Sequence, residues 1–156
     1  MTTNVMNWNK ALSDALWSGS VASVITTAVL AGCGSKERGA AAAGLNGPSQ
    51  WVWGRAAARQ RTFSVRHTVV GYLIHHVMSI FWATLFERIR DKQEASVPAT
   101  LGAAAATSAA ACLVDFRVVP KRLSPGFERQ LSRTALFVTY AAFALALAAA
   151  ATKARK

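Results

Sequence analysis

The sequence predicts an all-α integral membrane protein with four transmembrane helices. Of its 156 residues, 53% are apolar, which is an unusual composition for a soluble domain of this size. The apolar residues gather in four stretches, 12–32, 69–86, 97–119 and 133–151, and about 20 helical residues cross a hydrocarbon core about 30 Å thick. The last stretch ends in ALFVTYAAFALALAAAA (135–151) and lacks the polar stripe of a helix in a soluble bundle. We therefore expect residues 1–156 to form a single transmembrane domain.

The basic residues lie almost entirely between these stretches. A net charge of +11 would ordinarily suggest nucleic acid as a partner. Here six Lys/Arg lie between the first two stretches, three between the next two, and five at the junction of the last two, from Arg117 to Arg133. Such loops bind anionic lipid head groups, so we expect the lipid bilayer, and no nucleic acid, as a partner. The first and third loops hold eleven basic residues against seven at the termini and second loop, which slightly favours an external N-terminus.

The first stretch carries a row of small side chains at every fourth position. Spacing of four places them on one face, where they allow another helix to approach closely. The third stretch repeats the pattern in two rows, Ala99–Ala103–Thr107–Ala111 and Gly102–Ala106–Ala110. We expect helix packing through the following residues of the two stretches: Ala15, Gly19, Ser23, Thr27, Gly102 and Ala106.

The end of the first stretch allows an alternative. The residues Leu30-Ala31-Gly32-Cys33 resemble a bacterial lipobox, in which the cysteine is lipidated and everything before it is removed. The apolar run is longer than a signal-peptide core of about 7 to 15 residues, and a signal peptide has no use for a row of small residues. We expect the uncleaved chain, with a lipoprotein cleaved at Cys33 as the alternative.

The long loop after the first stretch is rich in tryptophan and arginine. Trp51 and Trp53 precede Arg55 and Arg59, a composition typical of the membrane interface. We predict a short helix over residues 49–61 lying along the membrane surface. The alternative is an irregular basic loop, because Gly54 interrupts the segment.

The second stretch contains two adjacent histidines, His75 and His76. A short charged turn joins it to the third stretch, so the two helices are antiparallel and Asp115 lies within about one helical turn of the histidines in depth. Tyr72 and Ser79 share the face of the histidines. We therefore predict an intramembrane polar cluster made of His75, His76, Asp115, Tyr72 and Ser79.

The cluster predicts no metal site and no cofactor. Adjacent residues on a helix point about 100° apart, so His75 and His76 cannot both bind one metal ion. No other predicted helix offers a histidine, so one chain cannot hold a haem between histidines of two helices.

Two functions remain open for these residues. As intramembrane ionisable groups they could serve a proton-coupled transporter or a membrane enzyme. They could also be structural, with Asp115 paired to Arg117 or Arg122, and Asp14 and Glu87 paired to Arg88. The chain has no phosphate-binding glycine loop, GxSxG, HExxH or CxxC motif, so we assign no catalytic residue. The leading hypothesis is a non-enzymatic accessory or assembly subunit that packs through small-residue faces against another membrane subunit or a second copy.

The segments GYLIHHVMSIFWATLFER (71–88) and DFRVVPKRLSPGFE (115–128) resemble those of small bacterial four-helix membrane proteins. The order of segments is similar to that of the inner-membrane family typified by the acid-resistance protein YagU. The resemblance covers the middle and last third of the chain and implies a multi-pass protein of the bacterial inner (plasma) membrane. It implies no catalytic residue.

Overall fold

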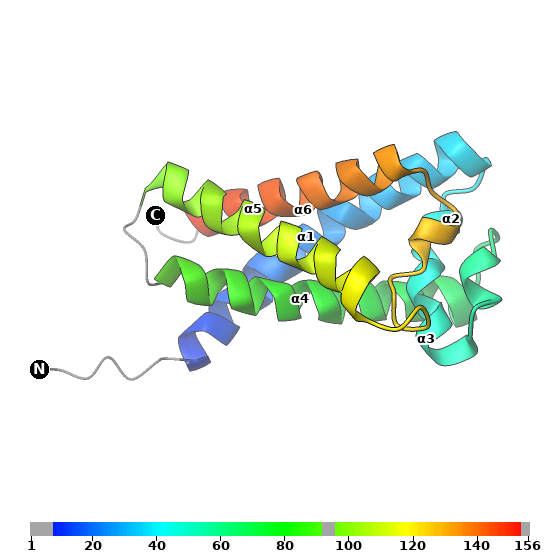
Figure 1. The fold of residues 1–156 in the computed structure, drawn as a ribbon, viewed down its shortest axis with the longest axis horizontal. Helices are drawn as coiled ribbons and strands as arrows, with labels where there is room; N and C mark the ends of the chain where they lie inside the picture. Colours follow the sequence, from blue (N-terminus) through cyan, green and yellow to red (C-terminus); the bar gives the residue numbers. More distant parts are fainter. Residues whose placement is uncertain (1–7, 92–95, 154–156) are drawn as a thin grey trace, which may run out of the picture.

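The structure, a computed structural model, describes residues 8–91 and 96–153, in which every regular element is helical. Its four long helices are α1 (Trp8–Arg38), α4 (Val70–Asp91), α5 (Val97–Leu113) and α6 (Arg133–Lys153) (Figure 1). A π-helical turn, Val65–Val69, leads into α4, and another, Val114–Val118, extends α5. All four are long and apolar enough to cross a membrane, which confirms the predicted four-helix membrane protein.

The first two helices extend beyond the predicted stretches. Residues 12–32 were expected in the first and 69–86 in the second, whereas α1 spans Trp8–Arg38 and α4 continues to Asp91. Hydropathy marks the residues that suit the hydrocarbon core, but the helical hydrogen bonds continue into polar residues on either side.

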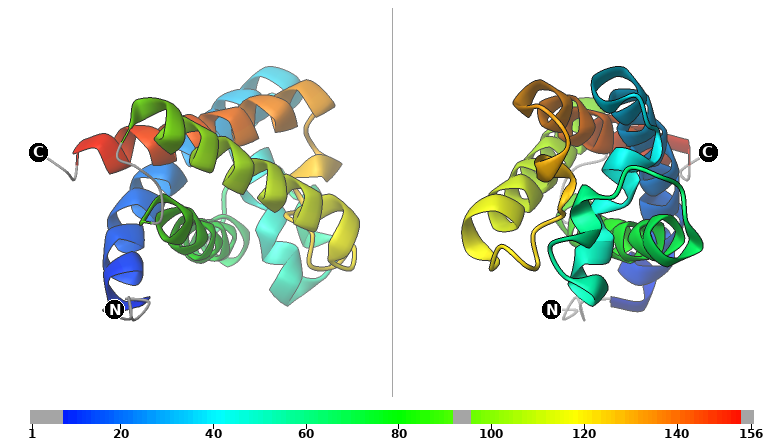
Figure 2. Two further views of the ribbon diagram at one scale, coloured as in Figure 1. Left: turned by 60° about the vertical axis from the view of Figure 1, so that its left-hand side comes forward. Right: turned by 90° about the vertical axis from the view of Figure 1, so that its right-hand side faces the viewer.

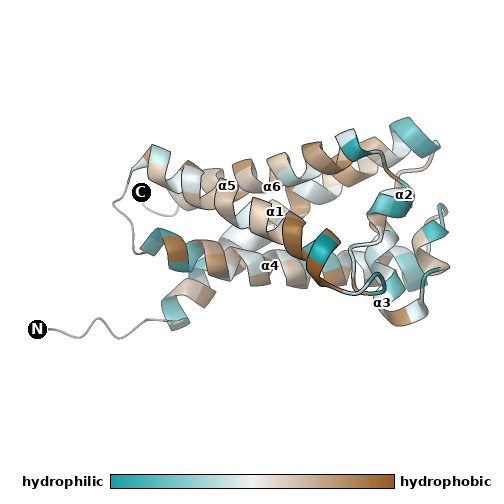
Figure 3. Cartoon of the chain, viewed as in Figure 1, coloured by the Kyte–Doolittle hydropathy of each residue, from teal (hydrophilic) through white to brown (hydrophobic). Residues whose placement is uncertain are grey.

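Alanine dominates the buried core, and many of the large apolar side chains point outward. The core is built mainly of alanine, together with Trp82, Phe86, Phe143 and Leu147. Hydrophilic residues gather at the helix ends and in the loops, while the middles of the long helices are mostly white to brown (Figure 3). Exposed large side chains occur on every long helix, for example Trp17, Phe81, Leu101 and Phe137. Lipid is as apolar as leucine, so membrane helices associate through close packing of small residues.

Helix α1 packs against both α4 and α6. Gly19 lies at the tightest contact with α4, because a Cβ added there would be 2.7 Å from Ile80 Cα. Ala15, Gly19 and Ser23 are buried, but Thr27 is only half-buried. Four residues turn a helix by about 400°, so a row at every fourth position drifts by about 40° per step. The buried line of α1 passes instead to Ala22, Thr26 and Leu30.

Helix α5 buries only one of its two predicted rows. Ala103, Thr107 and Ala111 are buried, and the Ser108 hydroxyl donates a hydrogen bond of 2.7 Å to Tyr140 O of α6. Gly102 and Ala106 lie on the exposed face of the chain.

The first and third loops form a cap over one end of the bundle. The first loop contains α2 (Ala42–Leu45), a 3₁₀ turn at Gly47–Ser49, α3 (Gln50–Trp53) and a 3₁₀ turn at Ala57–Arg59, and the third loop contains a 3₁₀ turn at Phe127–Arg129. The end-on view shows the cyan first-loop segments between the capped ends of α4 and α5 (Figure 2). We name this region the cap.

The predicted continuous helix over 49–61 is wrong. Its residues form α3 and two 3₁₀ turns, and the chain breaks at Gly54, whose φ is +78°. A positive φ is accessible to glycine and incompatible with a continuing α-helix. Gly54 therefore ends α3 and prevents one continuous helix.

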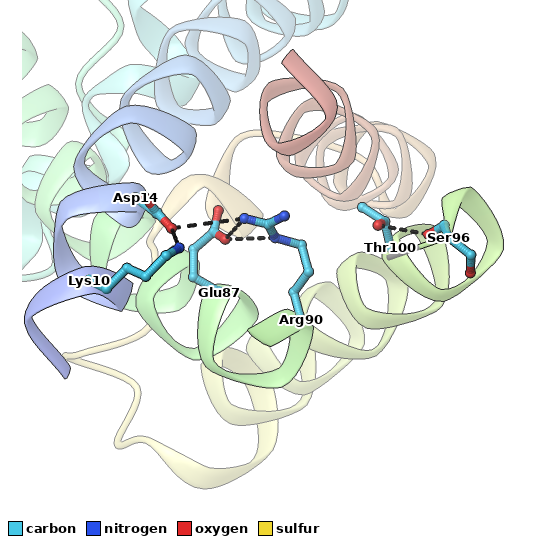
Figure 4. A network of polar contacts seen from close by, with 6 residues as sticks. All are labelled: Lys10, Asp14, Glu87, Arg90, Ser96 and Thr100. Carbon is cyan, nitrogen blue, oxygen red and sulfur yellow. Dashed lines mark hydrogen bonds and ion pairs between the residues drawn. The ribbon is translucent and has the colours of Figure 1, made fainter. Parts of the chain in front are cut away.

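An ion network lies at the end of the bundle opposite the cap (Figure 4). Buried Arg90 contacts buried Glu87 at 2.6 Å and Asp14 of α1 at 4.0 Å, and Lys10 contacts Asp14 at 2.5 Å. Glu87 therefore pairs with Arg90 and Asp14 mainly with Lys10, in place of the predicted Arg88. The Arg88 guanidinium lies 4.4 Å from the ring centre of Trp8.

Candidate functional site

A cavity of about 70 Å³ lies beneath the cap. All four long helical segments and both cap loops contribute to its wall. The lining residues are Thr26, Pro48, Trp51, Ile74, His75, Met78, Ser79, Trp82, Ala111, Asp115, Pro125, Phe127, Thr139, Tyr140 and Phe143. The structure thus brings His75, Ser79 and Asp115 of the predicted cluster to one cavity.

His75 is bound to α1 through Thr26. The two side chains meet at 2.9 Å between His75 Nε2 and Thr26 Oγ1. The Thr26 hydroxyl also donates to Ala22 O at 2.8 Å, so the threonine links His75 to the backbone of α1. Ser79 donates to His75 O at 2.8 Å, one turn further along α4. The imidazole is therefore fixed by a neighbouring helix.

Asp115 is bound to α6 through Tyr140. The Tyr140 hydroxyl donates a hydrogen bond of 2.5 Å to Asp115 Oδ2. No lysine or arginine among the described residues forms an ion pair with Asp115, so the predicted pairing with Arg117 or Arg122 is not present. The Tyr140 hydroxyl of α6 is the partner of Asp115 instead of an arginine.

His76 and Tyr72 lie apart from the cavity wall. Their rings lie 5.6 Å apart between centroids and are tilted by 33°, and His76 Nδ1 is buried without a hydrogen-bond partner among the described residues. The rotation of about 100° between adjacent helical residues separates the two histidines. The predicted cluster of five is therefore divided between the cavity and this pair of rings.

The partners Thr26 and Tyr140 were missed from sequence. Both are polar residues inside apolar stretches, which is a signal that the sequence does carry. Their pairing depends on the rotation of α1 and α6 about their own axes, and hydropathy does not determine that rotation.

Buried amides hold the cap over the cavity. Gln50 donates to Ser124 O at 2.7 Å and accepts from Arg129 Nε at 3.1 Å, which ties the first loop to the third. Asn46 donates to Gln60 O at 2.9 Å and accepts from Thr68 at 2.7 Å. Both amide side chains are fully buried, where satisfied polar groups specify one arrangement.

The predicted interfacial residues all lie in the cap. Trp51 is half-buried and donates its indole N–H to Ser124 O at 3.1 Å. Trp53 is exposed and donates to Arg66 O at 2.9 Å, while the Arg66 guanidinium lies over its ring. Arg55 and Arg59 are exposed. Contact of these side chains with lipid head groups stays a prediction.

Within the described ranges, no three His, Cys, Asp or Glu side chains gather as a metal site would require. Comparisons with protein-family models, with curated proteins and with solved structures find no match to this chain.

Proposed function

We propose that this protein is a non-enzymatic accessory or assembly subunit of the bacterial inner membrane. It packs against a transmembrane helix of a partner subunit through the exposed face of α5. We define this face by Gly102 and Ala106, together with their exposed neighbours Ala105 and Ala109.

The observation that supports this function is the exposure of Gly102. A Cβ added at Gly102 would meet no atom within 4 Å, whereas one added at Gly19 would be 2.7 Å from Ile80 Cα. The small residues Ala15, Gly19 and Ser23 of α1 are buried within the bundle. Small residues favour close approach of a second helix in lipid, and at Gly102 the described chain supplies none.

The outer surface of α6 is different. It exposes the large side chains Phe137 and Leu145, at 75% and 62% of their maximum, and large apolar side chains suit contact with lipid chains. The small-residue face of α5 is therefore better suited to a protein partner than the outer surface of α6. The α6 surface serves as a control on the same molecule.

The charge of the cap favours its location in the cytoplasm. The cap and the adjoining ends of the long helices carry eleven of the eighteen Lys/Arg residues. Basic loops remain preferentially on the cytoplasmic side, so we propose an external N-terminus.

Photo-crosslinking in native membranes tests the proposed contact. A photoreactive amino acid is placed at position 102, and a control chain carries it at position 145 on α6. We expect position 102 to yield one adduct of discrete mass with another membrane protein, and position 145 to yield lipid adducts. Lipid adducts alone at position 102, or an adduct only at twice the 16.6 kDa chain mass, would contradict an accessory subunit.

A further inference from the structure

We propose that the cavity and an adjoining groove on α4 form one binding site for a single-chain lipophilic amine. The ammonium group lies at Asp115, and the hydrocarbon chain lies along the outer surface of α4. This inference is independent of the α5 contact proposed above.

The first support is the set of ionisable residues in the cavity wall, His75, Asp115 and Tyr140. At the opposite end of the bundle, Asp14 and Glu87 each lie near basic side chains. Asp115 has the Tyr140 hydroxyl as a partner, and no lysine or arginine lines the cavity. Carboxylates within membrane proteins pair with a cation or mark a ligand site. An ammonium group supplies the missing positive charge, whereas an anionic head group would be repelled.

The second support is the aromatic lining. Five aromatic side chains surround the cavity: Trp51, Trp82, Phe127, Tyr140 and Phe143. The face of an aromatic ring attracts a cation, tryptophan most strongly, and the attraction increases when water is excluded. A carboxylate among aromatic rings is the combination that recognises an organic ammonium ion.

The third support is the groove. It is lined by Trp51, Leu73, Ile74, Val77 and Met78, and it shares Trp51, Ile74 and Met78 with the cavity. Leu73 and Val77 are exposed at 53% and 63%, so the groove opens on the outer, membrane-facing side of α4.

The volumes of the cavity and the groove indicate where the head group and the hydrocarbon chain of the ligand lie. A cavity of about 70 Å³ has room for a few water-sized groups but not for a long hydrocarbon chain. The groove, of about 230 Å³, has wholly apolar walls. The amine therefore enters from the bilayer with its head group first, and its chain remains between α4 and lipid.

Photolabelling of the full-length protein in phosphatidylcholine nanodiscs tests this site. The probe is n-decylamine carrying a diazirine in its chain, and the competitors are n-decylamine, n-decanol and n-decanoate, which share one chain length. We expect labelled peptides to include residues 73–78. We expect n-decylamine to compete at least tenfold better than n-decanol, with no competition by n-decanoate.

Two variants locate the head group. Asp115→Asn should reduce competition by n-decylamine to the level of n-decanol. Asp91→Asn, which changes an exposed carboxylate at the opposite end of α4, should leave it unchanged. Equal competition by the amine and the alcohol on the wild-type chain, or labelling outside α4 and the cavity wall, would overturn the proposal. The wild-type series decides the question even if Asp115→Asn fails to fold.

Discussion

Gly19 shows how one hydrogen atom in place of a methyl group determines helix packing. Gly19→Ala would bring a Cβ to 2.7 Å from Ile80 Cα and 3.0 Å from Ala83 Cβ, and backbone atoms cannot move aside as a flexible side chain can. We expect a loss of about 1 to 3 kcal/mol in the free energy of unfolding, measured by unfolding in detergent.

The matched control is Gly32→Ala on the same helix, where an added Cβ meets nothing within 4 Å. It should leave stability unchanged or slightly increase it, because alanine favours the helix. Equal stability of the two variants would show that α1 does not pack closely on α4 at Gly19.

Tyr140 and Tyr72 form a second matched pair. Tyr140→Phe removes the only side-chain hydrogen bond that Asp115 has among the described residues, while the Tyr72 ring packs on His76 and makes no side-chain hydrogen bond in the same ranges. Hydrogen bonds to charged or membrane-buried groups contribute about 1 to 2 kcal/mol. Thermal unfolding should therefore show a lower unfolding temperature for Tyr140→Phe and almost no change for Tyr72→Phe. The opposite order would remove Tyr140 as the partner of Asp115.

At the scale of elements, the end of α4 is held to α1 by charge. Arg90→Leu would leave Glu87 buried without its partner at 2.6 Å, and breaking one side of a buried pair costs about 3 to 5 kcal/mol. Lys10→Ala removes a half-exposed partner of Asp14 and should cost less than about 1 kcal/mol. Chemical denaturation of both variants measures the difference. A loss for Arg90→Leu no larger than that for Lys10→Ala would contradict the assigned pair.

The cap depends on Asn46, which bonds to Gln60 O, Thr62 O and Thr68 Oγ1. Asn46→Ala removes these bonds and should release the segment that contains Arg55, Arg59 and Arg61. We expect several-fold faster trypsin cleavage in this segment, measured by mass spectrometry of the fragments. Gln60→Ala is the control, because only the backbone carbonyl of Gln60 takes part. Equal cleavage rates would show that Asn46 does not hold the cap.

The sequence predicts the helices better than their contacts. Continuous apolar stretches of about 20 residues specify transmembrane helices strongly, and the short separation of the second and third stretches in sequence predicts that Asp115 lies near the depth of the histidines. The partners Thr26 and Tyr140 depend on helix rotation, which composition does not encode. The predicted row of small residues on α1 shows the same limit. Gly19 is buried, whereas Thr27, on the same predicted face, is only half-buried. The sequence shows that residue 54 is glycine, which often ends a helix. Its φ of +78°, where α3 ends, is known only from the folded cap.

At the scale of the whole molecule, we propose different roles for three surfaces. In this proposal the basic cap lies on one side of the membrane, the cavity and the α4 groove bind a ligand from the bilayer, and the small-residue face of α5 packs against a partner helix. The last of these carries the proposed function. Because an added Cβ at Gly102 meets nothing within 4 Å, a large residue there should disturb the partner contact and leave the bundle intact.

Native mass spectrometry of the protein released from its own membrane tests the central claim most directly. We predict that the wild-type chain is released in a complex heavier than 16.6 kDa by the mass of a partner subunit. We predict that Gly102→Leu, with an unchanged unfolding temperature, is released as the lone chain. Release of the wild-type protein as a 16.6 kDa monomer, or an unchanged complex for Gly102→Leu, would contradict the account.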